Sequence, residues 1–442
     1  MRTALLVCQF FFVSLMVSVQ NGAYAAGLPR HGVLGAQLQM TDGMVSVKAV
    51  IPGSAAAKAN LMPGDGIRSI NRIPAAATAD VISSIRRTPA GTTISMEILR
   101  NGTAQTINVT VGTPAAESDP AVQTLYESVT VNGSLRRTLV DIPKNAAGRR
   151  PAVLLIGGIG CFSVDVAANP EDGYLRITRD LARAGFVTMR LEKSGVGDSQ
   201  GTPCHDVDFQ DESGSYAVAL TALRKHSHVD PAHVYLLGHS IGTLIAPRLA
   251  LEQPVAGIVV SEAVGTNWFE YELANLRRQL EIGGDPPATV DDKLASKERC
   301  MHRLLIEKEP EQVIEQGEPA CKLRNGIYPV VDKYIQQVAS LNVIQPWTQL
   351  SVPVLAVYGT SDFVVNPADH ARIVAVVNSA HPGLASLSPV DAMDHNLQVA
   401  ATPFEFYTNN EKGVATQYQT EFSTVLLKWF CSRERCVNDA AQ

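Results

Sequence analysis

The chain has 442 residues and a formal net charge of -6, and 45% of its residues are hydrophobic while 18% are charged. This composition excludes a globally disordered chain, and nothing in it resembles a basic patch for nucleic acid. Domains typically hold roughly 100–200 residues, so we expect two or three of them.

The N-terminal segment is typical of a secretory signal peptide. Arg2 precedes an apolar run at 4–19, and residues 23–25, Ala-Tyr-Ala, match the small-residue cleavage site of such peptides. An uncleaved membrane anchor is the alternative. The run is short for a spanning helix, however, and no other stretch approaches the ~20 apolar residues that one needs. We therefore expect export to the periplasm or out of the cell, with residues 1–25 removed and no membrane span left.

Cysteine usage agrees with export, because disulfides persist in oxidising compartments. Of the 7 cysteines, Cys8 lies in the signal segment, and the connectivity of the others is open in principle. Proximity along the chain indicates the pairs Cys300–Cys321 and Cys431–Cys436, which leaves Cys161–Cys204. No Cys-x-x-Cys pair is present, so a zinc site is not expected.

Residues 30–112 alternate short apolar stretches with tight turns. The stretches 44–47 and 93–98 are predicted strands, and Pro-Gly-Asp-Gly at 63–66 marks a turn between them. Apolar residues within 80–87 have the spacing of a short amphipathic helix. This block therefore reads as a small, β-rich domain.

The same block resembles a PDZ domain of the bacterial protease-associated type. The likeness is carried by Pro-Gly-Ser-Ala-Ala at 52–56, Ala-Asn-Leu-Met-Pro-Gly-Asp at 59–65, residues 67–71 and Pro-Ala-Gly-Thr at 89–92. Asn60 departs from the glycine that the family usually has there. Asparagine tolerates a left-handed backbone, so the turn can be kept.

The resemblance also implies a peptide-binding turn, formed here by Val33, Leu34, Gly35 and Ala36. In the family, backbone N–H groups of this turn bind the C-terminal carboxylate of a peptide that adds to the sheet as a strand. The alternative is a PDZ fold that serves only as a rigid module between domains, because a fold alone does not fix a function.

A linker rich in Pro, Ala and acidic residues is predicted at 113–121, and a second domain at 122–442. This second domain alternates apolar strand runs with helical stretches such as 173–184 and 213–224. The alternation predicts an α/β domain with a mostly parallel sheet and helices on both faces. The predicted strands are 135–142, 153–156, 186–191, 234–237, 257–261, 354–358 and 386–390.

One stretch interrupts this rhythm. Residues 265–346 are rich in charge and helix formers and contain no apolar strand run. We expect a helical cap inserted over the site. A long surface excursion without function is the alternative, but unstructured loops of this length are uncommon.

The strongest motif is Gly-His-Ser-Ile-Gly at 238–242, which lies between the strand run 234–237 and an apolar helical stretch at 243–251. A serine hydroxyl is a poor nucleophile unless a base takes its proton. A sharp strand-to-helix turn exposes the hydroxyl above a sheet, and the helix N-terminus stabilises developing negative charge. The setting therefore predicts Ser240 as a nucleophile.

This second domain resembles the α/β-hydrolase superfamily, whose catalytic triad follows the order Ser, acid, His. Gly-Thr-Ser-Asp at 359–362 matches the acid turn of the family and implies Asp362 as the acid. Asp-Ala-Met-Asp-His-Asn at 391–396 matches the histidine loop and implies His395 as the base. Glu262, directly after the strand run 257–261, is the rival acid, because some members of the family place it there.

The resemblance also implies two N–H donors for an oxyanion hole. One is Ile241, directly after the nucleophile. The other comes from the glycine-rich loop 157–161, where Ile159 is the first choice and Gly160 and Cys161 are the alternatives. The family usually has histidine at the position of Gly157. A disulfide from Cys161 to Cys204 would brace this loop, whereas a reactive free thiol at Cys161 is the rival interpretation.

Together these features predict an exported, cofactor-independent serine hydrolase with a PDZ domain. Carboxylic ester hydrolysis through an acyl-serine intermediate is favoured, because no peptidase-specific signal accompanies the triad. The alternatives are a serine peptidase supplied with peptide C-termini by the PDZ domain, and a non-catalytic adaptor with a degenerate hydrolase domain. The expected partners are a small-molecule or peptide acyl substrate and a peptide C-terminus, without nucleic acid.

Overall fold

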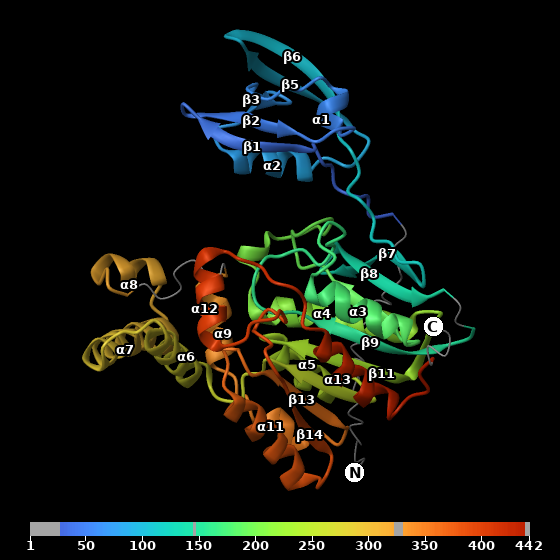
Figure 1. The fold of residues 1–442 in the computed structure, drawn as a ribbon, viewed down its shortest axis with the longest axis vertical. Coiled ribbons are helices and arrows are strands. Elements are labelled where there is room, and N and C mark those ends of the chain that lie inside the picture. The colour runs from blue at the N-terminus through green and yellow to red at the C-terminus, as the bar shows by residue number, and fades with distance from the viewer. Residues whose placement is uncertain (1–26, 145–146, 322–329, 438–442) are drawn as a thin grey trace, which may run out of the picture.

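The computed structural model describes residues 27–144, 147–321 and 330–437, so the predicted signal peptide lies outside the described residues. Figure 1 shows a small domain of strands joined to a larger body of mixed strands and helices. Within these ranges, no helix has both the length and the apolar character needed to cross a bilayer.

The small domain is an antiparallel sheet with two helices. Its elements are β1 (Ala36–Thr41), β2 (Met44–Val50), α1 (Ala55–Lys58), β3 (Gly66–Ile70), β4 (Ile73–Pro74), α2 (Thr78–Arg86), β5 (Thr93–Arg100) and β6 (Thr103–Thr110). The strand order is β1-β2-β3-β5-β6, with β4 paired to β3, so β1 is an edge strand. Along β5, Ile94, Met96 and Ile98 alternate with exposed residues and point into the core. Asn60 has a φ of 56°, the left-handed backbone expected at that turn.

The body is built on an 8-stranded sheet with the order β14-β13-β12-β11-β9-β10-β8-β7. Its strands are β7 (Val122–Val131), β8 (Ser134–Pro143), β9 (Arg150–Ile156), β10 (Val187–Leu191), β11 (Val229–His239), β12 (Gly257–Ser261), β13 (Val354–Gly359) and β14 (Ala385–Val390). The strands from β14 to β10 are parallel, whereas β8 pairs antiparallel with both β10 and β7. The sequence did not predict β7, which forms a hairpin with β8.

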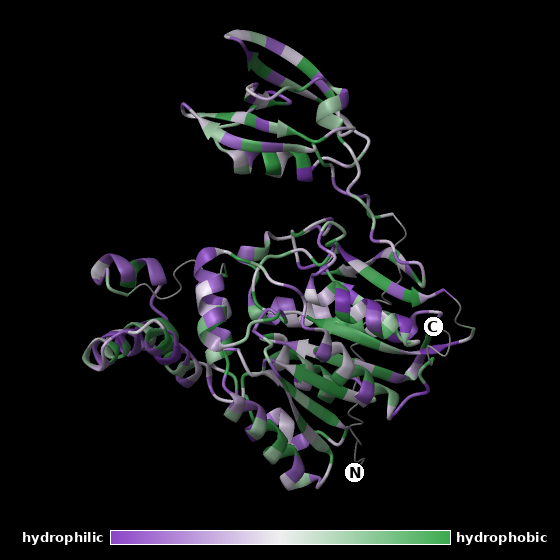
Figure 2. Ribbon diagram, viewed as in Figure 1, coloured by the Kyte–Doolittle hydropathy of each residue, from purple (hydrophilic) through white to green (hydrophobic). Residues whose placement is uncertain are grey.

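Helices cover both faces of this sheet, and Figure 2 shows apolar residues concentrated along its central strands. On one face lie α4 (Phe209–Lys225), α5 (Gly242–Glu252) and α11 (Pro367–Ala380), and on the other lie α3 (Gly173–Arg183) and α13 (Thr420–Cys431). Side chains of β9 alternate between the two cores, since Leu154 packs with the first group and Leu155 with the second. Two short elements, η1 (Cys204–Asp206) and α12 (Pro403–Lys412), belong to the connecting loops. The predicted α/β-hydrolase fold with a preceding PDZ domain is confirmed.

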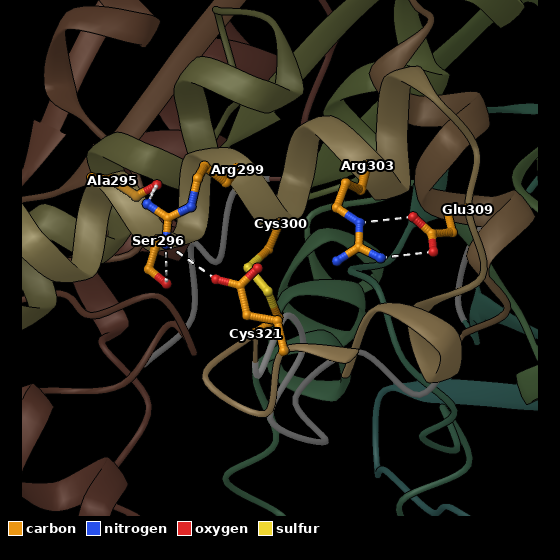
Figure 3. The surroundings of a disulfide bond; sticks show 8 residues. Ala295, Ser296, Arg299, Cys300, Arg303, Glu309 and Cys321 are labelled. Atoms are coloured by element: carbon orange, nitrogen blue, oxygen red, sulfur yellow. Dashed lines mark hydrogen bonds and ion pairs between the residues drawn. A yellow bond between two sulfur atoms is a disulfide. The ribbon is translucent and has the colours of Figure 1, made fainter. Parts of the chain in front are cut away.

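In the described part of 265–346 the chain forms helices and no strand. They are α6 (Trp268–Ile282), α7 (Pro287–Met301), the π-helical turn η2 (His302–Ile306), α8 (Glu311–Gly317), α9 (Asp332–Ala339) and α10 (Gln345–Gln349). Figure 3 shows how the segment is held together: a disulfide joins Cys300 to Cys321, and Arg303 pairs with Glu309 at 2.7 Å. A disulfide stabilises the folded segment mainly by constraining its unfolded chain.

The two domains meet through the segments that flank the small one. Arg30 forms ion pairs with Asp165 at 2.5 Å and with Asp198 at 3.0 Å, both in loops of the body. Within the predicted linker, Glu117 is buried and pairs with the buried Arg190 on β10 at 2.6 Å. The linker is therefore anchored to the body along part of its length.

Candidate active site

Ser240 lies on a sharp turn between β11 and α5. Its φ of 53° is the left-handed conformation that such a turn requires, and its N–H donates to Ser261 O at 3.0 Å. The turn packs closely against β9, because a Cβ on Gly242 would lie 2.2 Å from Ile156 O. Gly242 therefore allows the nucleophile turn to lie directly against β9.

The structure brings Ser240, His395 and Asp362 into one hydrogen-bonded chain. The Ser240 hydroxyl lies 3.1 Å from His395 Nε2, and His395 Nδ1 lies 2.7 Å from Asp362 Oδ2. The other oxygen of Asp362 accepts hydrogen bonds from the N–H groups of Val364, at 2.5 Å, and Val365, at 3.3 Å. These contacts fix both oxygens of the carboxylate, so the imidazole is oriented with Nε2 toward the serine.

Electrostatics of the triad favour an ionised acid and a basic imidazole. Burial alone would raise the pKa of Asp362, but the neighbouring His395 and hydrogen bonds from His395 and Glu262 lower it below its ordinary value. Burial alone would lower the pKa of His395, but the charge and hydrogen bond of Asp362 raise it. A more basic imidazole takes a proton from serine more readily.

Glu262, the rival acid, lies beside Asp362 without contacting the ring of His395 by a hydrogen bond. It is fully buried after β12, and its Oε1 accepts a hydrogen bond from Gly359 N–H at 2.8 Å. Burial and the charge of Asp362 raise its pKa well above its ordinary value. The position that contacts His395 is thus held by Asp362.

The two predicted oxyanion donors face the same space. Ile159 and Ile241 both line the cavity above Ser240, and neither backbone N–H finds an acceptor among the described residues. The neighbouring Gly158 N–H is already occupied, because it donates to Tyr174 Oη at 2.7 Å. Of the predicted alternatives, Gly160 does not line this cavity. Cys161 does not line it either, so the geometry favours Ile159.

Two residues that the sequence did not single out connect the loops of the site. The hydroxyl of Tyr174, on α3, donates to His239 Nδ1 at 2.7 Å, and His239 Nε2 donates to His395 O at 2.9 Å. Burial lowers the pKa of His239 to about 3, so its ring stays neutral and can both accept and donate. This network links the glycine-rich loop 157–161, here called the oxyanion loop, to the histidine loop 391–396 through Gly158. His239 belongs to the nucleophile motif, which was its only sequence signal.

A disulfide and a buried carboxylate stabilise the oxyanion loop. A disulfide joins Cys161 to Cys204, with a Cα–Cα distance of 5.7 Å. Glu192 accepts hydrogen bonds from the Ser163 hydroxyl and, at 3.2 Å each, from the N–H groups of Val164 and Asp165. These contacts hold the C-terminal part of the loop and the residues that follow it. The third predicted pair, Cys431–Cys436, is also joined in the structure.

A cavity of about 470 Å³ opens above Ser240. Its walls come from α6, α12 and the surrounding loops, and they combine aromatic side chains, Phe162, Trp268, Tyr271, Phe363 and Phe406, with neutral amides such as Asn275 and Gln279. Asp172 is the only carboxylate among its described lining residues, and it is occupied as the N-cap of α3. The cavity therefore suits an uncharged, partly apolar group.

The predicted peptide-binding turn lies at the start of the edge strand β1. The carbonyl groups of Leu34 and Gly35 accept hydrogen bonds from within the domain, whereas their N–H groups find no acceptor among the described residues. Val33 pairs with Gly112 in both directions, at 2.9 and 2.8 Å, and Ala36 pairs with Val50. The turn thus has unpaired N–H donors of the kind that a carboxylate needs. Figure 1 shows α2 on the side of the small domain that faces the body. A cleft of about 380 Å³ lies between the small domain and the body.

Within the described ranges, two clusters bring three groups able to bind a metal within 4.8 Å of one another. In one, Cys300 and Cys321 are joined as a disulfide beside Glu318. In the other, Asp362 and His395 bind each other next to Glu262. Neither cluster offers a set of uncommitted ligands.

Comparison with protein families agrees with this architecture. Residues 32–111 match the profile of the PDZ domain. Residues 171–395, just over half of the chain, match the hydrolase family described as serine aminopeptidase, S33. The second match includes Ser240, Asp362 and His395.

Individual relatives match parts of the chain. Esterase EstD of Thermotoga maritima is 24% identical over 55% of this chain and 53% of its own length. The periplasmic pH-dependent serine endoprotease DegQ of Escherichia coli is 39% identical over 17% of this chain and 16% of its own. The chain thus spans about half the length of the first relative and a small part of the second. Among solved structures, Est1E from Butyrivibrio proteoclasticus has 14% identity, a TM-score of 0.43 and coverage of 70% of this chain and 99% of its own. The chain combines a PDZ domain with an α/β-hydrolase domain, and it belongs to the hydrolase family described as serine aminopeptidase, S33.

Proposed function

We propose that the protein is an exported serine hydrolase that cleaves carboxylic esters through an acyl-serine intermediate. The observation that carries the proposal is the hydrogen-bonded chain from Ser240 through His395 to Asp362 beneath a cavity lined by aromatic and neutral polar side chains. This is the arrangement that serine hydrolases of several folds use for acyl transfer.

In the proposed acylation step, His395 Nε2 takes the proton of the Ser240 hydroxyl while Oγ bonds to the ester carbonyl carbon. The carbonyl oxygen gains negative charge and accepts hydrogen bonds from the N–H groups of Ile159 and Ile241. The protonated imidazole is stabilised by Asp362 and gives its proton to the departing alkoxide. The products of this step are an alcohol and an acyl-serine.

Deacylation repeats the sequence with water. His395 takes a proton from the water molecule, whose oxygen bonds to the acyl carbon, and then returns the proton to Ser240 Oγ as the carboxylic acid leaves. Because the same groups serve both steps, loss of the Ser240 hydroxyl removes both.

The lining of the cavity supports esters over peptide N-termini. An aminopeptidase must neutralise the α-ammonium group of its substrate, and a buried cation needs an opposite charge. Asp172, the single lining carboxylate among the described residues, accepts hydrogen bonds from the N–H groups of Tyr174 and Leu175. Both N–H groups compete with any cation for this carboxylate, and burial raises its pKa above the ordinary value. The relative named esterase EstD supports the same choice.

A fluorophosphonate probe and two substrate series test this proposal. The wild-type protein should be labelled at Ser240, Ser240→Ala should not, and p-nitrophenyl acyl esters should be turned over faster than aminoacyl p-nitroanilides. Absence of labelling would support the non-catalytic adaptor. Faster anilide turnover, or peptide turnover that is lost on deleting residues 30–112, would support the peptidase.

The PDZ domain is proposed to bind a peptide C-terminus at the turn of Val33, Leu34, Gly35 and Ala36. The unpaired N–H groups of Leu34 and Gly35 and the edge strand β1 support this role. Titration of the full chain with one peptide, either with a free or with an amidated C-terminus, tests it. Binding should require the free carboxylate, and equal binding of both forms would contradict the assignment.

Export is supported by the disulfides, which persist in oxidising compartments. Fractionation of cells that express the full chain, followed by N-terminal sequencing, tests it. The mature protein should begin after Ala25 and lie outside the cytoplasm. Retention of residues 1–25 in the cytoplasmic fraction would contradict export.

A further inference from the structure

Glu262 occupies a position between the nucleophile and the acid turn. It follows β12 directly, its N–H donates to Val357 O on β13 at 3.2 Å, and the preceding Ser261 O accepts from Ser240 N–H. Its own φ of 54° is left-handed, which costs energy for a residue with a long side chain. The fold therefore holds a large acidic side chain, in a strained conformation, inside the core next to the triad.

The two carboxyl oxygens of Glu262 have different surroundings. Oε1 accepts the hydrogen bond from Gly359 N–H, whereas Oε2 is buried and receives no hydrogen bond from any donor in the described ranges. One carboxyl oxygen of Glu262, one of Asp362 and a ring nitrogen of His395 lie within 4.8 Å of one another. Two buried carboxyl groups this close to each other are satisfied only if one of them carries a proton and donates it to the other.

The charges around this pair decide which carboxyl group holds the proton. Asp362 is engaged by the His395 ring and by two backbone N–H groups, all of which favour its ionised form. Glu262 receives one backbone hydrogen bond. Its burial and the negative charge of Asp362 both raise its pKa, which favours its protonated form. The titratable or charged groups near it are Asp362 on the turn after β13, Asp394 and His395 on the loop after β14, His370 on α11 and Arg278 on α6.

On the basis of the proposed triad, we propose that Glu262 is a positioning residue whose protonated carboxyl group donates a hydrogen bond to the Asp362 carboxylate. It thereby holds Asp362 in the orientation that aligns His395 with Ser240. Oε1 meanwhile fixes the start of the acid turn through Gly359. Glu262 touches neither the substrate nor the reacting atoms in this scheme, and it acts through Asp362 alone.

Infrared difference spectroscopy tests the protonation directly. Glu262→Gln keeps a carbonyl oxygen for Gly359 and supplies an N–H donor for Asp362, so it is matched in shape and hydrogen bonding. The spectrum of wild type minus Glu262→Gln at neutral pH should contain the C=O stretch of a neutral carboxylic acid. Carboxylate bands in its place would overturn the proposal.

Kinetics with a p-nitrophenyl ester test the positioning role. Glu262→Gln should keep kcat within about 3-fold of wild type, whereas Glu262→Ala should lower kcat about 10-fold or more with little change in KM. Equal kcat for Glu262→Ala and wild type, or equal impairment of the two variants, would overturn the role. Glu272→Gln is the matched control, because Glu272 is a buried glutamate on α6 that pairs with Lys297 at 3.2 Å and does not line the cavity above Ser240.

The infrared result does not depend on turnover, so this inference and the proposed function can fail separately. Turnover that persists in Ser240→Ala would refute the proposed function whatever Glu262 does. Turnover that is lost in Ser240→Ala while the difference spectrum shows carboxylate bands would refute only the role of Glu262.

Discussion

Removing the disulfide between Cys161 and Cys204 should reduce both stability and turnover. The double variant Cys161→Ala/Cys204→Ala releases the oxyanion loop from η1. The matched control is Cys431→Ala/Cys436→Ala, which opens a disulfide at the end of α13, remote from the cavity. Each variant lacks one disulfide. The two variants differ in the length of chain that the deleted disulfide closes and in the place of that disulfide in the fold.

The magnitude follows from the length of chain that each bond closes. The sequence separations are 43 residues for Cys161–Cys204 and 5 for Cys431–Cys436. The loop-entropy relation then gives losses of roughly 4 and roughly 2 kcal/mol in the free energy of unfolding. The first variant should therefore be the less stable one by about 2 kcal/mol.

The assays are urea unfolding and ester hydrolysis. Tryptophan fluorescence reports the body alone, because the 3 tryptophans, Trp268, Trp347 and Trp429, all lie there. The Cys161 variant should also lose about 10-fold in kcat, less than the loss of a whole oxyanion donor, because Ile159 N–H is no longer held in place. The control should keep its kcat. Equal destabilisation of the two variants, or an unchanged kcat in the first, would refute the reasoning.

Three further outcomes are expected. Because Asp362 raises the pKa of His395 above its ordinary value of 6.5, kcat/KM should fall as the pH falls through a midpoint above 6.5, and a lower midpoint would contradict the assignment. Burial raises the pKa of Glu192 from 4.5 to about 7, so its charge destabilises the fold increasingly between these pH values. Urea titrations should show Glu192→Gln gaining up to about 3 kcal/mol over wild type across that window, whereas a gain independent of pH would refute it. Tyr174→Phe leaves Gly158 N–H without an acceptor and should cost about 1–3 kcal/mol in unfolding and lower kcat with little change in KM. Unchanged unfolding and kinetics would show that the hydroxyl is dispensable.

The sequence predicts those parts of the site that follow directly from local pattern. Ser240, Asp362 and His395 each come shortly after a predicted strand, and parallel strands bring their carboxyl ends to one edge of the sheet. Their proximity is therefore implied by strand order alone. Strand β7 escaped prediction because its inward residues are mixed with polar and half-buried ones, so no apolar run marks it.

Residues whose role depends on contacts between distant loops could not be predicted in this way. Tyr174 and His239 are 65 residues apart, and Glu262 is 97 residues from Gly359. Nothing in the letters around Tyr174 indicates that its hydroxyl meets a histidine of the nucleophile turn. Glu262 was recognised as an acid near the site, but its neutral state follows only from its burial beside a second carboxyl group.

The distance between the acid and the base depends on one small residue. Gly359 ends β13, and its partner across the ladder is Val390, the last residue of β14. A Cβ on Gly359 would lie 2.1 Å from Met393 O, so the acid turn and the histidine loop touch backbone to backbone. Ser361 N–H donates to the same carbonyl group at 3.0 Å. A side chain here would push the two loops apart, and the 2.7 Å contact between His395 and Asp362 depends on their approach. The glycine that marks the acid turn in the sequence is thus a packing requirement of the triad.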